Sequence, residues 1–270
     1  MVVQHNLTAM NANRNLSTVT GAQQKSTEKL SSGYRINRAA DDAAGLSISE
    51  KLRSQIRGLD KAASNSQDGI SLVQVAEGAL NETHSILQRM NELATQAAND
   101  TNTSIDRTAI SAEMNQLTSE INRIQSTTQF NTMNLLDGTF TSKNLQVGAM
   151  SGQTIVISVT KMSASNIGVS GLSVSSNTNA GKAMSKIQLA IQSVSAQRSK
   201  LGAIQNRLEH TINNLEATSE NTSSAESRIR DTDMASEMVE YSKNNILQQA
   251  GQSMLAQANQ QTQGVVSLLQ

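Results

Sequence analysis

Apolar residues recur every three or four positions along most of this 270-residue chain, which is the spacing of one face of an α-helix. The clearest stripe advances in strict seven-residue steps, through Ile187, Val194, Leu201, Leu208 and Leu215. A seven-residue repeat sustained over this length is typical of a coiled coil. It predicts one helix over about residues 180–223, roughly 65 Å long.

Two further stripes, over residues 72–97 and 105–124, predict partner helices for the first. The same spacing also follows the acidic pair Asp41 and Asp42. Burying five seam residues gains roughly 8 to 15 kcal/mol, whereas ordering about 40 backbone residues costs about 1 to 2 kcal/mol each. A single long helix therefore needs partners, and we expect a mainly α fold, an elongated antiparallel bundle of long coiled-coil helices.

The middle of the chain follows a different pattern, because apolar and polar residues alternate there. Leu145 and Val147, then Ile155 and Ile157, flank a turn-like stretch at 150–153. This pattern predicts a small β-hairpin region near residues 139–175. The segment 167–179, rich in Gly and Ser, is expected to add another short extended piece.

Both chain ends carry apolar stripes, although chain ends are usually polar. The stripe residues are Val3, Leu7, Met10 and Leu16 near the start, and Ile246, Leu247, Met254, Leu255, Leu268 and Leu269 near the end. If the two end helices paired only with each other, much of the surface of each helix would remain exposed to solvent. We therefore expect contacts with other copies of the chain. A head-to-tail contact that does not close produces a helical filament.

Composition narrows the classes of function. The chain has no Pro, Cys or Trp and only two Tyr and two Phe, which favours thin aliphatic helix seams and, through the absence of Pro, uninterrupted helices. The formal net charge is zero, so neither nucleic acid nor a membrane is expected as a partner. No apolar run is long enough for a membrane span, and the start lacks the features of a secretory signal.

Candidate chemistry is sparse. His5, His84 and His210 share no ligand spacing, and no phosphate loop or nucleophile turn occurs, so we expect no metal, no cofactor and no catalytic residue. The pair Asp41 and Asp42 could do acid-base work or bind a cation. The favoured interpretation places the pair at a helix start, with Arg35 and Arg38 as charge partners.

Two long segments resemble the signatures of bacterial flagellins. They are KLSSGYRINRAADDAAGLSISEKLRSQIR at 29–57, and SRIRDTDMASEM followed by NNILQQAGQSMLAQANQ within 227–260. The resemblance extends over roughly residues 1–175 and 180–270. The chain departs from the family pattern at Tyr34, where leucine is frequent, at Thr262 and Gly264, which replace Pro and Asn, and at Gln270, where arginine is frequent.

The resemblance implies a minimal, Firmicutes-like flagellin without outer D2 or D3 domains. Residues 1–40 and 235–270 would form the terminal coiled coil D0 with its connecting spoke, and residues 41–234 the helical rod D1. The implied function is that of a structural subunit of the extracellular flagellar filament, exported unfolded by the flagellar type III system and polymerised into a helical propeller. Implied partners are other copies of the chain, a FliS-type export chaperone that holds the C-terminal stripe, the filament cap and the hook-filament junction proteins.

The resemblance also implies recognition by animal Toll-like flagellin receptors, because LQRMNELATQAAND at 87–100 matches the recognised stretch. Arg89 and Leu93 match contact residues, and Glu113 is the expected third; the same helix face could instead pack neighbouring subunits.

Three other classes of protein are weighed against the filament subunit: a signalling hairpin like chemoreceptor tails, a hook-filament junction adaptor, and a metalloprotease. The missing membrane spans disfavour the first, and the lack of a His-Glu-x-x-His motif disfavours the last.

Overall fold

The structure is a computed structural model that describes residues 6–267, the last six of them by backbone alone. Its helices are α1 (Leu7–Ser32), α2 (Ala43–Ala97), α3 (Ser104–Thr127), α4 (Asn177–Arg230) and α5 (Met234–Ser267), and its strands are β1 (Gln129–Phe130), β2 (Met133–Asn134), β3 (Lys143–Gln146) and β4 (Thr154–Ile157). The chain divides into two compact units. Unit 1 is the described part of Met1–Gln55 and Asn221–Gln270, and unit 2 is Ile56–Glu220.

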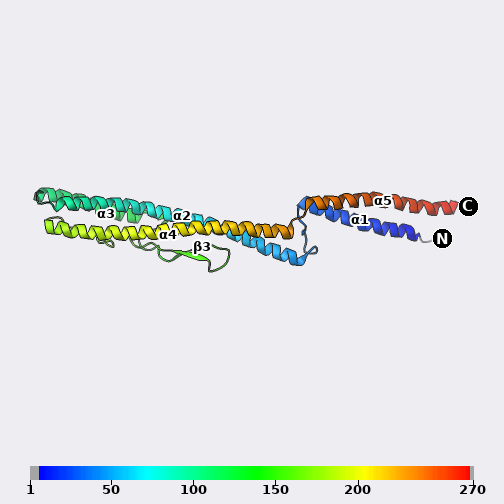
Figure 1. Ribbon diagram of the computed structural model, residues 1–270, viewed down its shortest axis with the longest axis horizontal. Helices are drawn as coiled ribbons and strands as arrows, with labels where there is room; N and C mark the ends of the chain where they lie inside the picture. The colour runs from blue at the N-terminus through cyan, green and yellow to red at the C-terminus, as the bar shows by residue number, and fades with distance from the viewer. Residues whose placement is uncertain (1–5, 268–270) are drawn as a thin grey trace. The chain divides into compact units, whose positions relative to one another are not determined.

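Helices α2 and α4 lie side by side (Figure 1), and an aliphatic seam between them holds unit 2 together. All five residues of the seven-residue stripe on α4 are at most 7% exposed. Three of them, Ile187, Val194 and Leu201, pack with the buried stripe of α2, which includes Val73, Leu80 and Leu87, and Ile121 of α3 joins the same core. The contacts of Leu59 with Leu215 and of Ile70 with Leu208 show that α2 and α4 are antiparallel. The predicted mainly helical fold with long antiparallel partners is confirmed.

The predicted hairpin is formed by β3 and β4, which pair antiparallel with Leu145 opposite Ile155. Ile155 and Ile157 are each 3% exposed, whereas Val156 between them is 50% exposed, so one face of β4 lies against the helices. The second strand pair, β1 with β2, is not predicted by the sequence pattern. Its turn residues Asn131 and Thr132 both have positive φ, 47° and 64°, and strands of two residues are too short to show an alternation.

The prediction of a further extended piece within residues 167–179 is wrong. The segment 164–172 forms successive turns, in which Ile167 N–H donates to the Ser163 carbonyl and Val169 N–H to the Ala164 carbonyl. Its apolar residues are buried nonetheless, because Val169 and Val174 are at most 1% exposed and belong to the main core. The apolar positions there therefore reflect burial of a turn against helices rather than a strand.

Unit 1 contains α1 and α5, which run antiparallel to each other (Figure 1). The Asn6 side chain donates to the Ala258 carbonyl at 3.0 Å, and Lys29 pairs with Glu237 at 3.5 Å near the other end. Helix α1 ends at Gly33, whose φ of 74° is left-handed and whose N–H donates to the Lys29 carbonyl, a common way to close a helix. Among the described residues, no helix is sufficiently long and apolar to span a membrane.

Candidate assembly surfaces

Among the buried and partly buried positions of α1 and α5, one row on each helix follows alternating steps of three and four residues, as in a coiled coil. On α1 this row is Ala9, Ala12, Leu16, Val19, Gln23, Ser26 and Leu30; on α5 it is Glu237, Tyr241, Asn244, Gln248, Gly251, Leu255 and Ala258. We call these two rows the α1–α5 seam. Leu16 lies close against Gly251, so close that a Cβ built on Gly251 would be 3.3 Å from Leu16 Cδ1.

The α1–α5 seam is mostly small or polar. In the described parts of the two helices, the residues with less than a tenth of their surface exposed are both polar, Ser26 at 3% and Asn244 at 4% exposure. Large aliphatic side chains in the seam are few and only partly buried. Hydrophobic burial between α1 and α5 is therefore small for helices of 26 and 34 residues.

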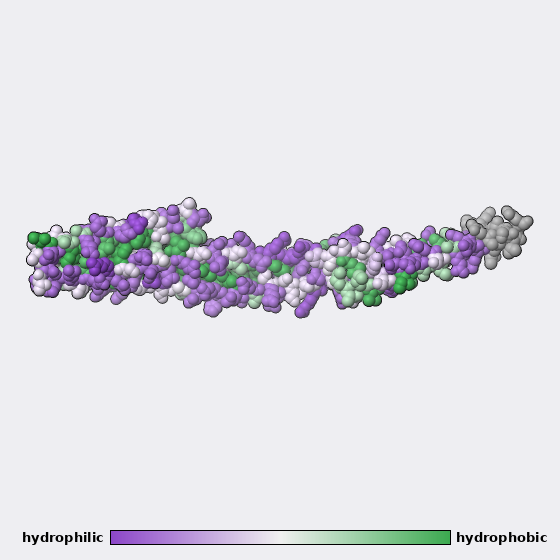
Figure 2. Space-filling view, turned by 90° about the horizontal axis from the view of Figure 1, so that it is seen from above, coloured by the Kyte–Doolittle hydropathy of each residue, from purple (hydrophilic) through white to green (hydrophobic). Residues whose placement is uncertain are grey.

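Other large apolar side chains of α1 and α5 point away from the seam. On α5 they form an outward row, defined as Val239, Ile246, Leu247 and Met254, whose members are 46% to 70% exposed. On α1, Leu7 and Met10 are 65% and 64% exposed. Apolar patches are visible on the surface of this unit in Figure 2. The helix pair thus exposes several bulky apolar residues on its outside, while its seam combines small and polar residues with a few aliphatic ones.

The predicted terminal stripes are split between these two surfaces. Leu16 and Leu255 lie in the α1–α5 seam and are partly buried. Five predicted residues are exposed: Leu7, Met10, Ile246, Leu247 and Met254. Val3, Leu268 and Leu269 lie outside the residues whose side chains the structure describes. The periodicity of the sequence located these residues, but it did not distinguish those in the α1–α5 seam from those that are exposed.

A polar clasp, which the sequence does not predict, joins the end of α1 to the end of α4. Arg35 N–H donates to the Arg230 carbonyl at 2.7 Å, and Thr232 N–H donates to the Gly33 carbonyl at 3.0 Å. The Arg230 guanidinium lies 4.7 Å from the centre of the Tyr34 ring and 2.9 Å from a Glu50 carboxylate oxygen. The hydrogen bond from Arg230 lowers the pKa of Glu50. These partners lie about 200 residues apart in the chain, so no local pattern could reveal them.

The acidic pair that precedes α2, Asp41 and Asp42, accepts hydrogen bonds from backbone N–H groups. Asp42 accepts a hydrogen bond from Gly45 N–H at 2.9 Å at the start of the helix, and Asp41 accepts from the backbone N–H groups of residues 37 and 38. Of the predicted charge partners, Arg38 is supported in part, because its positive charge contributes to lowering the pKa of Asp41, but the direct side-chain contacts of both arginines are with other groups. The Arg35 guanidinium donates to the Ile229 carbonyl, and the Arg38 guanidinium pairs with Glu28. The pKa of Asp41 is lowered mainly by the Arg38 and Asn37 backbone hydrogen bonds.

The predicted receptor-contact residues lie on α2 and α3 in unit 2. Arg89 is half exposed and pairs with Glu113 at 2.9 Å and with Glu92 at 3.2 Å. The hydrogen bonds to Glu113 and then Glu92 raise the pKa of Arg89. Leu93 is different, because it is 2% exposed and belongs to the core. The surface offers a charged Arg89–Glu113 pair, whereas Leu93 is not accessible.

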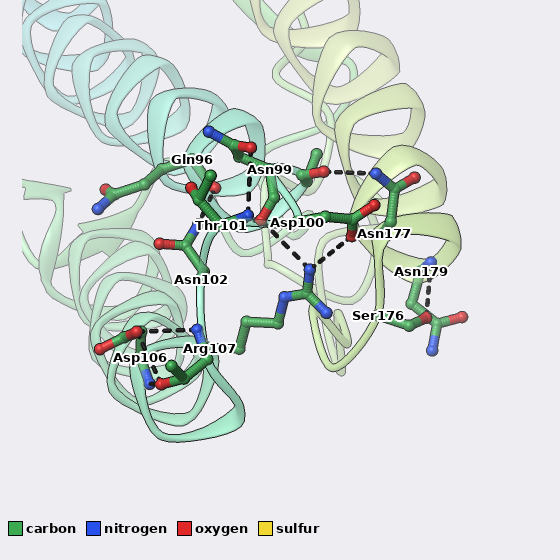
Figure 3. Close-up of polar contacts among 12 residues, drawn as sticks. Gln96, Asn99, Asp100, Thr101, Asn102, Asp106, Arg107, Ser176, Asn177 and Asn179 are labelled. Carbon is green, nitrogen blue, oxygen red and sulfur yellow. Dashed lines mark hydrogen bonds and ion pairs between the residues drawn. The ribbon is translucent and has the colours of Figure 1, made fainter.

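A second polar group lies at the end of unit 2 where α2 stops and α3 and α4 begin (Figure 3). Arg107 on α3 reaches back to donate to the Asn99 carbonyl at 3.2 Å and pairs with Asp100 at 3.0 Å. The Asn177 side chain, at the first residue of α4, donates to the Ala98 carbonyl. These bonds satisfy carbonyls that the end of a helix leaves without partners. The arrangement explains how three helix ends are held together.

The two histidines that the structure describes, His84 and His210, do not form a common site. His84 hydrogen-bonds Gln88 on the same helix, His210 is exposed, and His5 lies outside the described residues. In the described part of the chain, no group of three His, Cys, Asp or Glu side chains could hold a metal ion.

Long helical seams and a large outward apolar row define a structural protein whose surfaces suit packing against other proteins. Residues 3–141 match the family model of the bacterial flagellin N-terminal helical region, and residues 184–269 match that of the C-terminal helical region. The chain therefore belongs to the bacterial flagellin family, the structural subunits of the extracellular flagellar filament. Flagellins are not enzymes, which agrees with the chemistry expected from the sequence.

Similar proteins cover the whole chain. A flagellin of Halalkalibacterium halodurans is 58% identical, and a flagellin of Bacillus subtilis is 50% identical, each over 100% of both chains. Among solved structures, the crystal structure of Bacillus cereus flagellin is 32% identical with a TM-score of 0.52, covering 56% of this chain and 88% of that one. A putative flagellar hook-associated protein from Vibrio parahaemolyticus shares the fold at 15% identity and a TM-score of 0.59, over 71% and 100% of the two chains.

Proposed function

We propose that the chain polymerises into a motility filament by burying the outward row of α5, together with Leu7 and Met10 of α1, against neighbouring copies. In this proposal, residues 1–40 and 235–270 act as D0 and residues 41–234 as D1. The observation that carries the proposal is the reversed polarity of the helix pair, with Ile246 at 67% and Val239 at 70% exposure while Asn244 is buried. Exposed apolar surface of this kind marks a site of protein contact.

The energetics favour other copies as the cover for these residues. Fully burying one large aliphatic side chain stabilises an interface by roughly 1.5 to 3 kcal/mol, and the four members of the outward row on α5 are all available. A contact between the outward rows of successive subunits that does not close on itself would continue into a filament.

Assembly of a matched pair of charge variants tests the proposal. Ile246→Asp places a carboxylate in the outward row, whereas Gln252→Asp places one at another exposed position of the same helix, outside the outward row. We expect Ile246→Asp to abolish filaments in electron micrographs and in sedimentation, and Gln252→Asp to retain them. Deletion of residues 1–30 or 235–270 should also leave soluble monomers. Filaments formed as readily by Ile246→Asp and by both truncations would refute the proposal.

The length of the assemblies separates a filament subunit from a hook-filament junction adaptor. A filament subunit should add without limit, so micrographs of the parent protein should show lengths that increase with protein concentration and time. An adaptor should stop at a short ring. Assemblies that stay at ring length under all conditions would favour the adaptor.

We also propose that the C-terminal row is covered before assembly by a FliS-type chaperone, and that the unfolded chain leaves through the flagellar type III system and adds beneath the filament cap. The support is physical, because Ile246, Leu247 and Met254 would otherwise be exposed in the cell and would promote aggregation. Titration of the full chain with such a chaperone should show binding that Ile246→Asp weakens at least about tenfold. Equal affinity of the two chains would contradict this part.

A second candidate function is recognition by a Toll-like flagellin receptor through Arg89 and Glu113. The support is that both side chains are about half exposed and form one charged pair, and an arginine can bond carboxylates or carbonyls in a fixed fork. Arg89→Ala should reduce receptor-dependent reporter signalling. The matched control is Arg123→Ala, because Arg123 is also exposed and paired, with Glu120 on α3. Equal loss of signal in both variants would exclude a specific role for Arg89.

A further inference from the structure

We propose that Asn244 selects the register in which α5 pairs with α1. The inference rests on the proposed assembly through the outward apolar residues of α1 and α5, because it explains how those residues acquire a defined alignment. Asn244 is 4% exposed, and its Nδ2 atom has no hydrogen-bond partner among the described residues. A buried amide in a coiled-coil seam reduces stability but penalises every alignment that places it against apolar side chains.

The contacts on either side of Asn244 define the alignment. Leu16 lies against Gly251, and Lys29 pairs with Glu237. In an antiparallel pair these contacts place Asn244 level with residues 22–23 of α1, where the seam residue is the polar Gln23.

Alignments shifted by one heptad are the main competitors, because a heptad shift keeps both seam rows facing each other. A shift in one direction places Asn244 level with Leu30, and a shift in the other direction places it level with Leu16. In both cases the buried amide would face a large aliphatic side chain instead of Gln23. The remaining seam residues are mostly small or polar, and they distinguish these alignments only weakly.

A wrong register would damage the assembly surface. A one-heptad shift moves α5 along α1 by about 10 Å. Leu7 and Met10 on α1 would then be displaced by this distance from the outward row of α5. A surface that neighbouring copies must recognise repeatedly therefore needs one register.

The absence of cysteine from the chain allows a direct test by disulfide trapping. A Cβ built on Gly251 lies 3.9 Å from Leu16 Cβ, which falls within the Cβ to Cβ range of disulfides. The pair Leu16→Cys with Gly251→Cys therefore reports the described register. The pair Leu16→Cys with Ala258→Cys reports the register shifted by one heptad, since these positions are separated by about 10 Å along the axis in the described register.

The trap is applied to the full chain before assembly, with Asn244→Leu as the test variant. In the parent background, the in-register disulfide should exceed the shifted one by at least about tenfold, and in the Asn244→Leu background the two yields should come within about twofold. The matched control is Asn245→Leu, which changes the same residue type at the adjacent position, partly buried but outside the two seam rows. It should preserve the parent ratio.

Three results would overturn the proposal. One is a parent ratio retained in Asn244→Leu, and another is an equal loss of selectivity in Asn245→Leu. The third is loss of both disulfides in Asn244→Leu, because Asn244 would then hold the pair together rather than choose its alignment. Filament formation is scored separately on the cysteine-free variants, so a failed assembly proposal and a failed register proposal give different outcomes.

Discussion

At the scale of single residues, short polar side chains determine where the helices begin. The Asn6 side chain accepts from Ala9 N–H at the start of α1, and Asp233 accepts from the N–H groups of residues 235 and 236 at the start of α5. Thr103 and Asp106 form a reciprocal capping box at the start of α3. The Thr103 side chain and then its backbone N–H lower the pKa of Asp106, since both bonds favour the charged carboxylate.

This shift predicts a loss of stability in acid. Because the folded pKa of Asp106 lies below its ordinary value, its stabilising effect is complete at pH values above about 3.9 and is lost as the pH falls through the folded pKa. Asp106→Asn should therefore reduce the drop in melting temperature between about pH 5 and about pH 3. Circular dichroism melts at both pH values measure the effect. Asp68→Asn on the exposed face of α2 is the control, and an equal reduction in this variant would contradict the assignment.

Two glycines on α2 should respond differently to the same substitution. A Cβ added to Gly78 would have no neighbouring atom within 4 Å, whereas a Cβ on Gly58 would lie 2.9 Å from Ala149 Cβ and 3.3 Å from Ala149 Cα. Gly78→Ala should stabilise the chain by about 1 kcal/mol through helix propensity. In Gly58→Ala this gain should be offset by about 1 to 3 kcal/mol of overpacking against the hairpin. Urea denaturation measures both, and equal gains would show that the hairpin does not press on α2.

At the scale of elements, one side-chain amide from each long helix of unit 2 holds the non-helical segment between α3 and α4. Asn65 on α2 donates to the Gln146 carbonyl, and Asn122 on α3 accepts from Ala164 N–H. Gln197 on α4 donates to the Ser158 carbonyl and accepts from the Thr160 hydroxyl. A hairpin of two four-residue strands is only marginally stable alone, so these anchors determine where it lies.

Removal of the Gln197 anchor should loosen the hairpin. Gln197 is 3% exposed, and Gln197→Leu leaves the Ser158 carbonyl without its side-chain donor at a cost of about 1 to 3 kcal/mol. We expect a lower free energy of unfolding in urea and faster amide exchange in β3 and β4. Gln192→Leu, at an exposed position on the same helix, is the control. Unchanged exchange in Gln197→Leu would show that the apolar face of β4 suffices.

The sequence predicts those elements that are specified by a local, repeated pattern of apolar positions. The seven-residue stripe predicted the course of α4, and the alternation around Ile155 predicted the hairpin. The clasp of Tyr34 with Arg230 could not be predicted, because its partners are distant in the chain and each is unremarkable alone. The burial of Asn244 was also missed, because periodicity weighs only apolar positions and the α1–α5 seam is largely polar.

At the scale of the whole molecule, the buried apolar residues are distributed very unevenly between the two units. Among the described residues, Ile36 is the one aliphatic side chain of unit 1 that is less than a tenth exposed, and the remainder of the buried aliphatic core lies in unit 2. Burial of apolar area is the main favourable contribution to folding. Unit 1 should therefore have a much lower local stability than unit 2 while the chain is unassembled.

Hydrogen exchange measured by mass spectrometry tests this difference. In the unassembled chain, amides of α1 and α5 should exchange at least about tenfold faster than the amides of α4 around Val194 and Leu201, because local opening needs less free energy where little apolar surface is buried. In filaments the exchange of α1 and α5 should slow markedly, since neighbouring copies would then cover the outward apolar residues and stabilise the folded helices. Equal protection of the two units before assembly would show that the polar α1–α5 seam is stable on its own, and that the assembly partners do not complete its fold.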